Sequence, residues 1–163
     1  MIIVMMGVSG SGKTLVGSEL ARSLRWQFVD ADDYHSKSSV EKMRSGVPLD
    51  DRDRKPWLAA LKALLLQLDA QQISAVLACS SLRRDFRRSL SDRISELHFV
   101  FLAADQQLLS QRLRERRGHF MPATLLASQF AALEHPHEAL VLDAFQTVST
   151  LVEQVQLQLN VSR

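Results

Sequence analysis

The chain has 163 residues, 46% hydrophobic and 23% charged, which suits one globular domain with a packed core and excludes a wholly disordered chain. Its formal net charge is only +2, with acidic residues interspersed among 15 arginines and 5 lysines, so we expect no nucleic-acid surface. No apolar run approaches the roughly 20 residues of a membrane span, and the N-terminus lacks the basic leader of a secretory signal. Because the single cysteine, Cys79, cannot form an internal disulfide, we expect a cytoplasmic protein that binds no membrane.

The apolar residues follow two alternating patterns along the chain. Short, continuous apolar runs are typical of buried parallel strands, and they occur at residues 2–6, 28–30, 75–79, 97–102 and 140–142. Apolar residues at helical spacing fill the stretches around residues 16–24, 57–68, 108–113, 125–130 and 148–159. This alternation predicts the α/β class, with a five-stranded parallel sheet covered by helices on both faces in three α/β/α layers.

Two polar stretches interrupt the alternation. Residues 36–55 are polar and rich in turn-forming residues, and residues 114–122 are basic and contain Gly118. We expect neither stretch to join the sheet. The sequence therefore predicts one domain spanning residues 1–163, with a mobile substrate-binding insert at about 36–55 and a small mobile lid at about 112–122.

The first predicted strand leads directly into a P-loop, the pattern of Gly, four residues and Gly-Lys-Thr. We expect ATP to be bound by Gly7, Val8, Ser9, Gly10, Ser11, Gly12, Lys13 and Thr14. Glycines let the backbone curl closely around phosphates, and the exposed N–H groups and the positive end of the following helix hold the anion. Lys13 should reach the β- and γ-phosphates as a catalytic residue, and the Thr14 hydroxyl should bind Mg²⁺. The alternative is a tight, glycine-rich turn that binds no nucleotide.

Two carboxylates, Asp30 and Asp32, follow the second predicted strand. Residues two apart on a strand face the same side, and this end of a parallel sheet faces the ligand crevice. We expect Asp30 to order a water on Mg²⁺ and Asp32 to accept the proton of an acceptor hydroxyl, whereas the alternative is a solvated acidic turn. The third predicted strand ends in Cys79-Ser80 rather than in Asp, which points to the kinases of small metabolites and nucleotides.

Several further segments carry distinctive residue combinations. Besides the P-loop, they are Asp30, Asp32 and His35; Asp53-Arg54 with Pro56-Trp57-Leu58; Cys79-Ser80 with Arg87; Gly118-His119-Phe120-Met121; and Ser128-Gln129-Phe130. In these segments, and over roughly Ile3 to Asp143, the chain resembles the gluconate kinase (gluconokinase) family of P-loop small-molecule kinases. Ala31 stands where the family usually has glycine, which matters only if this position needs a positive φ.

The resemblance implies transfer of the ATP γ-phosphoryl group to the 6-hydroxyl of D-gluconate, with Mg²⁺ as the metal and a homodimer as the assembly. Gluconate needs a cation for its carboxylate and hydrogen-bond partners for its hydroxyls. The expected substrate-binding residues are Asp32, His35, Arg54, Arg87 and His119. Within the arginine cluster at residues 83–88, Arg87 is preferred because the family motif carries arginine at that position.

Two lid arginines complete the expected catalytic set. Arg112 and Arg116 lie four residues apart, on one face of a helix, from which they can share the charge of the transferring phosphoryl group when the lid shuts. The alternative for each is a surface ion pair. For His35 the alternative is a turn histidine, and for His119 it is packing within the lid.

Two other functions fit part of this sequence. One is a P-loop kinase for another small hydroxy acid, such as a shikimate-like substrate, because the Asp30–Asp32 pair suits both. The other is a nucleotide-binding regulator without catalysis, against which the intact Lys13, Thr14 and Asp32 argue. The Asp53-Arg54 and Gly118–Met121 segments favour gluconate.

Overall fold

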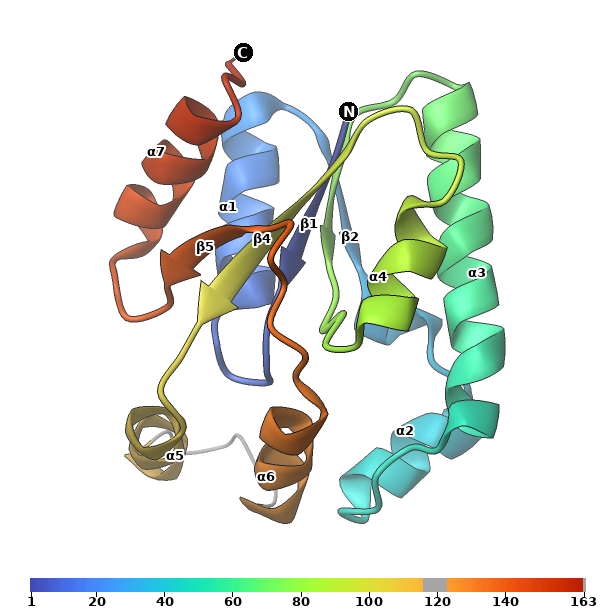
Figure 1. Ribbon diagram of the computed structural model, residues 1–163, viewed down its shortest axis with the longest axis vertical. Coiled ribbons are helices and arrows are strands. Elements are labelled where there is room, and N and C mark those ends of the chain that lie inside the picture. Colours follow the sequence, from blue (N-terminus) through green and yellow to red (C-terminus); the bar gives the residue numbers. More distant parts are fainter. Residues whose placement is uncertain (116–122, 163) are drawn as a thin grey trace.

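The computed structural model describes residues 1–115 and 123–162, and the side chains of residues 112–115 and 123–125 lie outside that description. Its centre is a single five-stranded sheet in which every pairing is parallel. The strands are β1 (Ile2–Met6), β2 (Gln27–Asp30), β3 (Ala75–Ala78), β4 (Leu97–Ala103) and β5 (Leu140–Asp143). They lie in the order β2-β3-β1-β4-β5, so β1, which feeds the P-loop, occupies the middle of the sheet (Figure 1).

Helices cover both faces of this sheet and complete the three predicted layers (Figure 1). Leu61 and Leu65 pack with β1 and β3 on one face, and Leu20 and Val155 pack on the other, all of them fully buried. The helices are α3 (Asp51–Ala70) and α4 (Arg84–Ser91) on the first face, and α1 (Lys13–Leu24) and α7 (Val148–Gln158) on the second. In the described part of the chain, no helix is both long and apolar enough to cross a membrane.

Three more helices lie beyond the carboxyl ends of the strands, where ligands bind in open parallel sheets (Figure 1). They are α2 (Lys37–Arg44), α5 (Gln106–Glu115) and α6 (Ala123–Ala132). A small apolar cluster joins this region to the phosphate loop, because Val8 is buried together with Leu82, Leu109 of α5 and Leu126 of α6. The last two helices are therefore packed directly on the P-loop.

Residues 36–55 stay out of the sheet, as predicted, and most of them are helical, with residues 45–50 as the connection between α2 and α3. The Ser36 hydroxyl caps α2 by accepting from the Ser39 N–H. A capping box then starts α3 six residues before the apolar stripe begins, since the Asp50 carboxylate accepts from the Asp53 N–H and the Asp53 carboxylate accepts from the Asp50 N–H. Helix α4 carries most of the arginine cluster at residues 83–88 and lies outside the stretches predicted as helical from apolar spacing.

Candidate active site

The phosphate loop has the backbone that its glycines allow. Gly7 has φ 145° and Gly12 has φ 99°, and a Cβ at Gly7 would come within 2.8 Å of the Leu102 carbonyl oxygen. Gly12 is the N-cap of α1 and provides no side-chain cap, so the first N–H groups of that helix remain available to an anion. Lys13 Nζ donates to the Val8 carbonyl at 3.0 Å inside the loop. Burial lowers the pKa of Lys13, while the nearby Asp32, Cys79 and Asp30 pull it back up.

The two residues expected at the metal are in contact with each other. Thr14 Oγ1 donates to Asp30 Oδ2 at 2.8 Å, and Asp30 Oδ1 accepts from the Asp32 N–H at 3.0 Å. Mg²⁺ prefers a few protein oxygens together with waters and phosphate oxygens. A hydroxyl and a carboxylate placed beside the P-loop fit that preference, so Thr14 and Asp30 could hold the ion.

Asp32 lies in a different structural element from the one predicted. Strand β2 ends at Asp30, and Asp32 lies in the 3₁₀ helix η1 (Ala31–Tyr34), so strand alternation does not relate the two carboxylates. Partial loss of hydration and then the Asp30 carboxylate raise the pKa of Asp32, against the opposing effect of Lys13. Its side chain is 87% exposed, so solvent screens these interactions.

His35 and Trp57 form a stacked pair on the wall of the site. Their ring centroids lie 4.7 Å apart with planes 6° from parallel, and Trp57 Nε1 donates to the Ala31 carbonyl at 2.7 Å. His35 Nε2 lies 3.9 Å from Asp32 Oδ1, and its side chain is only 7% exposed. Burial lowers the pKa of His35, with Asp32 opposing, so the ring is neutral near pH 7. Ala31 has no positive φ, which explains why alanine is accepted in place of glycine.

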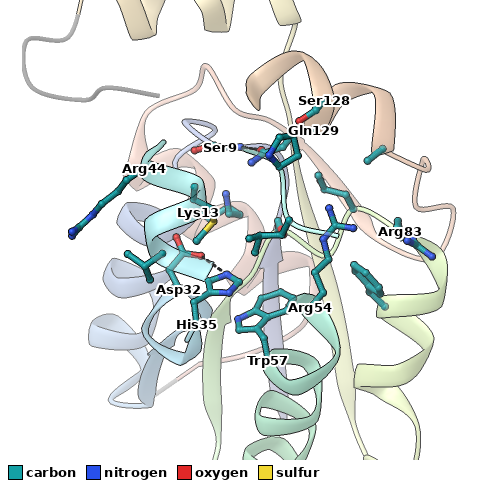
Figure 2. Close-up of a pocket in the computed structure, with 18 residues that line it drawn as sticks. Ser9, Lys13, Asp32, His35, Arg44, Arg54, Trp57, Arg83, Ser128 and Gln129 are labelled. Atoms are coloured by element: carbon teal, nitrogen blue, oxygen red, sulfur yellow. Dashed lines mark hydrogen bonds and ion pairs between the residues drawn. The ribbon is translucent and has the colours of Figure 1, made fainter. Parts of the chain in front are cut away.

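A cavity of about 480 Å³ connects the phosphate loop to α2, α3, α4 and α6 (Figure 2). Its polar and charged lining consists of Ser9, Lys13, Asp32, His35, Arg44, Arg54, Ser80, Arg83, Ser128 and Gln129. Its apolar lining consists of Val40, Met43, Pro48, Leu49, Trp57, Leu82, Phe86 and Ala132. Three sequence-predicted residues for the acceptor, Asp32, His35 and Arg54, therefore share one chamber with the P-loop lysine.

The arginines of the cavity differ in how fully their donors are occupied. Arg83 is held by Asp85 through Nε and Nη2, at 3.1 and 2.6 Å, and by Asp51 through Nη1 at 2.7 Å. Arg54 makes one long bond, from Nη1 to Asp51 at 3.3 Å, and lies 5.9 Å from the centre of the Phe86 ring. Figure 2 shows Arg54 extending into the cavity, while the Arg44 guanidinium is directed away from the other polar groups. Arg54 is thus the cation best placed to receive a carboxylate.

The chain is similar to known proteins in sequence and in fold. Residues 2–144 match a family model described as an AAA domain. A gluconokinase from Gluconobacter oxydans is 46% identical over 82% of this chain and 75% of its own length, and the thermoresistant gluconokinase of Escherichia coli is 39% identical over 93% and 89%. The chain belongs to the gluconokinase family. A crystal structure of a gluconokinase from Sinorhizobium meliloti superimposes with a TM-score of 0.87 at 37% identity, covering 97% of this chain and 90% of that one.

One residue that the gluconokinase resemblance assigned to substrate binding lies outside the cavity. Arg87 does not line the cavity, and its side chain is 1% exposed. Nε donates to Glu138 at 2.6 Å, and Nη1 donates to the carbonyls of Ser81 and Leu82 at 3.1 and 3.0 Å. The prediction that Arg87 binds substrate was wrong, because these groups hold the guanidinium inside the protein. Arg83, the last residue before α4, faces the cavity instead.

The structure does not describe the side chains of the predicted lid residues. Arg116 and His119 lie outside the described residues, and so does the side chain of Arg112. A cavity residue that sequence reasoning left without a role is Gln129 of α6, whose Oε1 accepts from the Ser9 N–H at 2.6 Å. Its place in the Ser128-Gln129-Phe130 motif was the available signal.

Proposed function

We propose that this protein transfers the γ-phosphoryl group of ATP to the 6-hydroxyl of D-gluconate, giving 6-phospho-D-gluconate. The observation that carries the proposal is that Lys13 of the P-loop, the carboxylate of Asp32 and the cation of Arg54 line one cavity of about 480 Å³. The phosphate loop and the candidate acceptor-binding residues therefore open into the same cavity. Membership of the gluconokinase family supports the choice of acceptor.

The donor side follows from the P-loop. The uncapped N–H groups at the start of α1 would bind the phosphates of ATP, and Lys13 would exchange the Val8 carbonyl for the β- and γ-phosphate oxygens. Thr14 and Asp30 would hold Mg²⁺, which when bound supplies positive charge to the phosphates. Because phosphoryl transfer needs little covalent chemistry from the protein, positioning and charge stabilisation account for most of the catalysis.

The acceptor side is built from Asp32, His35 and Arg54. Arg54 would bind the carboxylate with its unoccupied donors, and neutral His35 would hydrogen-bond a hydroxyl from its stacked position on Trp57. Asp32 would orient the reacting hydroxyl and accept its proton as the bond to phosphorus forms. Segment 36–55 contributes much of the wall around these groups, in keeping with a substrate-binding insert.

The gluconokinase resemblance alone supports several finer assignments. Arg112 and Arg116 would share the negative charge of the transferring group, and His119 would contact phosphate or substrate. A homodimer and a cytoplasmic location belong to the same proposal, and Mg²⁺ is the metal it names. Sedimentation of the purified protein tests the dimer directly.

The proposal is tested by measuring ATP consumption with a panel of hydroxy acids that includes gluconate, other hexonates and shikimate. We expect gluconate to give the highest kcat/KM and the Lys13→Ala variant to turn it over ~10² to 10³ times more slowly. Preference for shikimate would favour a kinase of another small acid. ATP binding without acceptor-dependent turnover would favour a nucleotide-binding regulator.

A further inference from the structure

Helix α6 touches the phosphate loop through a polar bond as well as through the apolar cluster of Val8, Leu109 and Leu126. The Ser9 N–H donates to Gln129 Oε1 at 2.6 Å, across 120 residues of sequence. Ser9 is the third residue of the P-loop and immediately precedes Gly10. One side chain of α6 is therefore fixed to the backbone that surrounds the phosphates.

This bond also determines which way the Gln129 carboxamide is turned. A backbone N–H can bond only to the amide oxygen, so the NH₂ group must occupy the other position. Gln129 lines the cavity together with Lys13, Arg54 and Asp32, and Figure 2 shows it beside Ser9. Within the described part of the chain, Nε2 donates no hydrogen bond. Two amide hydrogens are thus available to a ligand in the cavity.

We propose that Gln129 binds the acceptor, donating from Nε2 to an oxygen of the sugar acid while Oε1 remains on the Ser9 N–H. This inference rests on the proposed function, because it assigns a further residue to the same acceptor. One carboxamide then connects the acceptor to the loop that holds the phosphates, and so fixes the distance between the two reacting partners. Small errors in that distance are costly, since misplacement by about 1 Å can reduce a rate about 10²-fold.

Two substitutions separate this role from a purely structural one. Gln129→Glu keeps an oxygen for the Ser9 N–H but has no hydrogen to donate when ionised, whereas Gln129→Met keeps the length of the side chain and removes both bonds. Gln71→Glu, at the exposed end of α3, makes the same charge change far from the cavity and serves as the control. The measurements are KM for gluconate, KM for ATP, ADP affinity and the melting temperature.

We expect both Gln129 variants to raise KM for gluconate by ~10-fold or more and to lower kcat. ADP affinity and melting temperature should stay within error of wild type in Gln129→Met, whereas the new charge of Gln129→Glu beside the phosphate loop should also weaken ADP binding. The control should match wild type throughout. Gluconate kinetics unchanged in Gln129→Glu would overturn the inference, as would a Gln129→Met variant that loses ADP affinity and melting temperature together. Wild-type protein without gluconate-dependent turnover would instead overturn the proposed function, and the inference with it.

Discussion

Replacing Arg87 should destabilise the protein without weakening substrate binding, although the sequence favoured Arg87 as the carboxylate ligand. The guanidinium is 1% exposed and bonds to Glu138 and to the carbonyls of Ser81 and Leu82. Arg87→Met keeps most of the buried volume but leaves all three acceptors without their donor. The variant therefore isolates the polar role of the side chain.

The expected loss of stability in Arg87→Met follows from the hydrogen bonds that its three acceptors lose. Breaking a fully buried ion pair costs about 3–5 kcal/mol, and an orphaned buried carbonyl costs about 1–3 kcal/mol. Glu138 is 46% exposed and can regain water, and Arg87 Nη2 has no partner among the described residues, so both effects reduce the loss. We expect about 2–4 kcal/mol, which for a chain of this length lowers the melting temperature by about 5–15 °C.

The assay compares Arg87→Met with the matched variant Arg54→Met by thermal or urea unfolding and by gluconate kinetics. Arg54 is 27% exposed and has one 3.3 Å ion pair with Asp51, a surface contact worth at most about 1 kcal/mol. We expect Arg54→Met to fold with nearly wild-type stability and to raise KM for gluconate at least ~10-fold. An Arg87→Met variant that keeps its melting temperature and raises KM for gluconate would contradict a structural role for Arg87.

Four further outcomes are expected. Lys13→Ala should fold and lose ~10² to 10³ in kcat, because the lysine meets charge that builds in the transition state; kcat near wild type would contradict this. Asp32→Asn should lower kcat ~10²-fold or more, and its melting temperature at pH 7 should not fall, since a carboxylate with a raised pKa costs folded-state stability once it is ionised. Asp30→Asn should be partly rescued by excess Mg²⁺, and a larger, Mg²⁺-insensitive loss would exchange the roles of the two aspartates. Because the pKa of His35 is lowered on folding, stability should decline as pH falls below about 6.5, and His35→Gln should show a smaller decline in melting temperature between pH 7.5 and 5.5.

The layers of the fold could be predicted because the inner strands β1 and β3 are buried along their whole length. The continuous apolar run at Ile2–Met6 identifies a central strand, and the β1 residues indeed lie between β3 and β4. Apolar spacing does not reveal helix α4, because only Leu90 and Arg87 of its residues are buried and one of these is an arginine. Amphipathicity read from apolar residues alone cannot detect a helix that buries an arginine.

The site was predictable where a motif dictates local geometry, and uncertain where tertiary packing decides. The P-loop fixes the backbone around Lys13 through its glycines. In contrast, Arg83 and Arg87 are four residues apart in one cluster. Arg87 turns away from the cavity because it bonds to the distant Glu138 and to loop carbonyls. The Gln129 contact with Ser9 likewise joins segments 120 residues apart. No local sequence pattern predicts such long-range contacts.

The most direct test of the account is the identity of the phosphorylated atom in the product. Purified protein is incubated with ATP, Mg²⁺ and D-gluconate, and the product is analysed by phosphorus–proton correlation NMR. Transfer to the terminal hydroxyl predicts coupling of one new phosphate to the two C6 protons, and Lys13→Ala should form this product ~10² to 10³ times more slowly. Phosphate coupled to any other proton of gluconate, or formation of ADP without a phosphorylated acid, would contradict the proposed function.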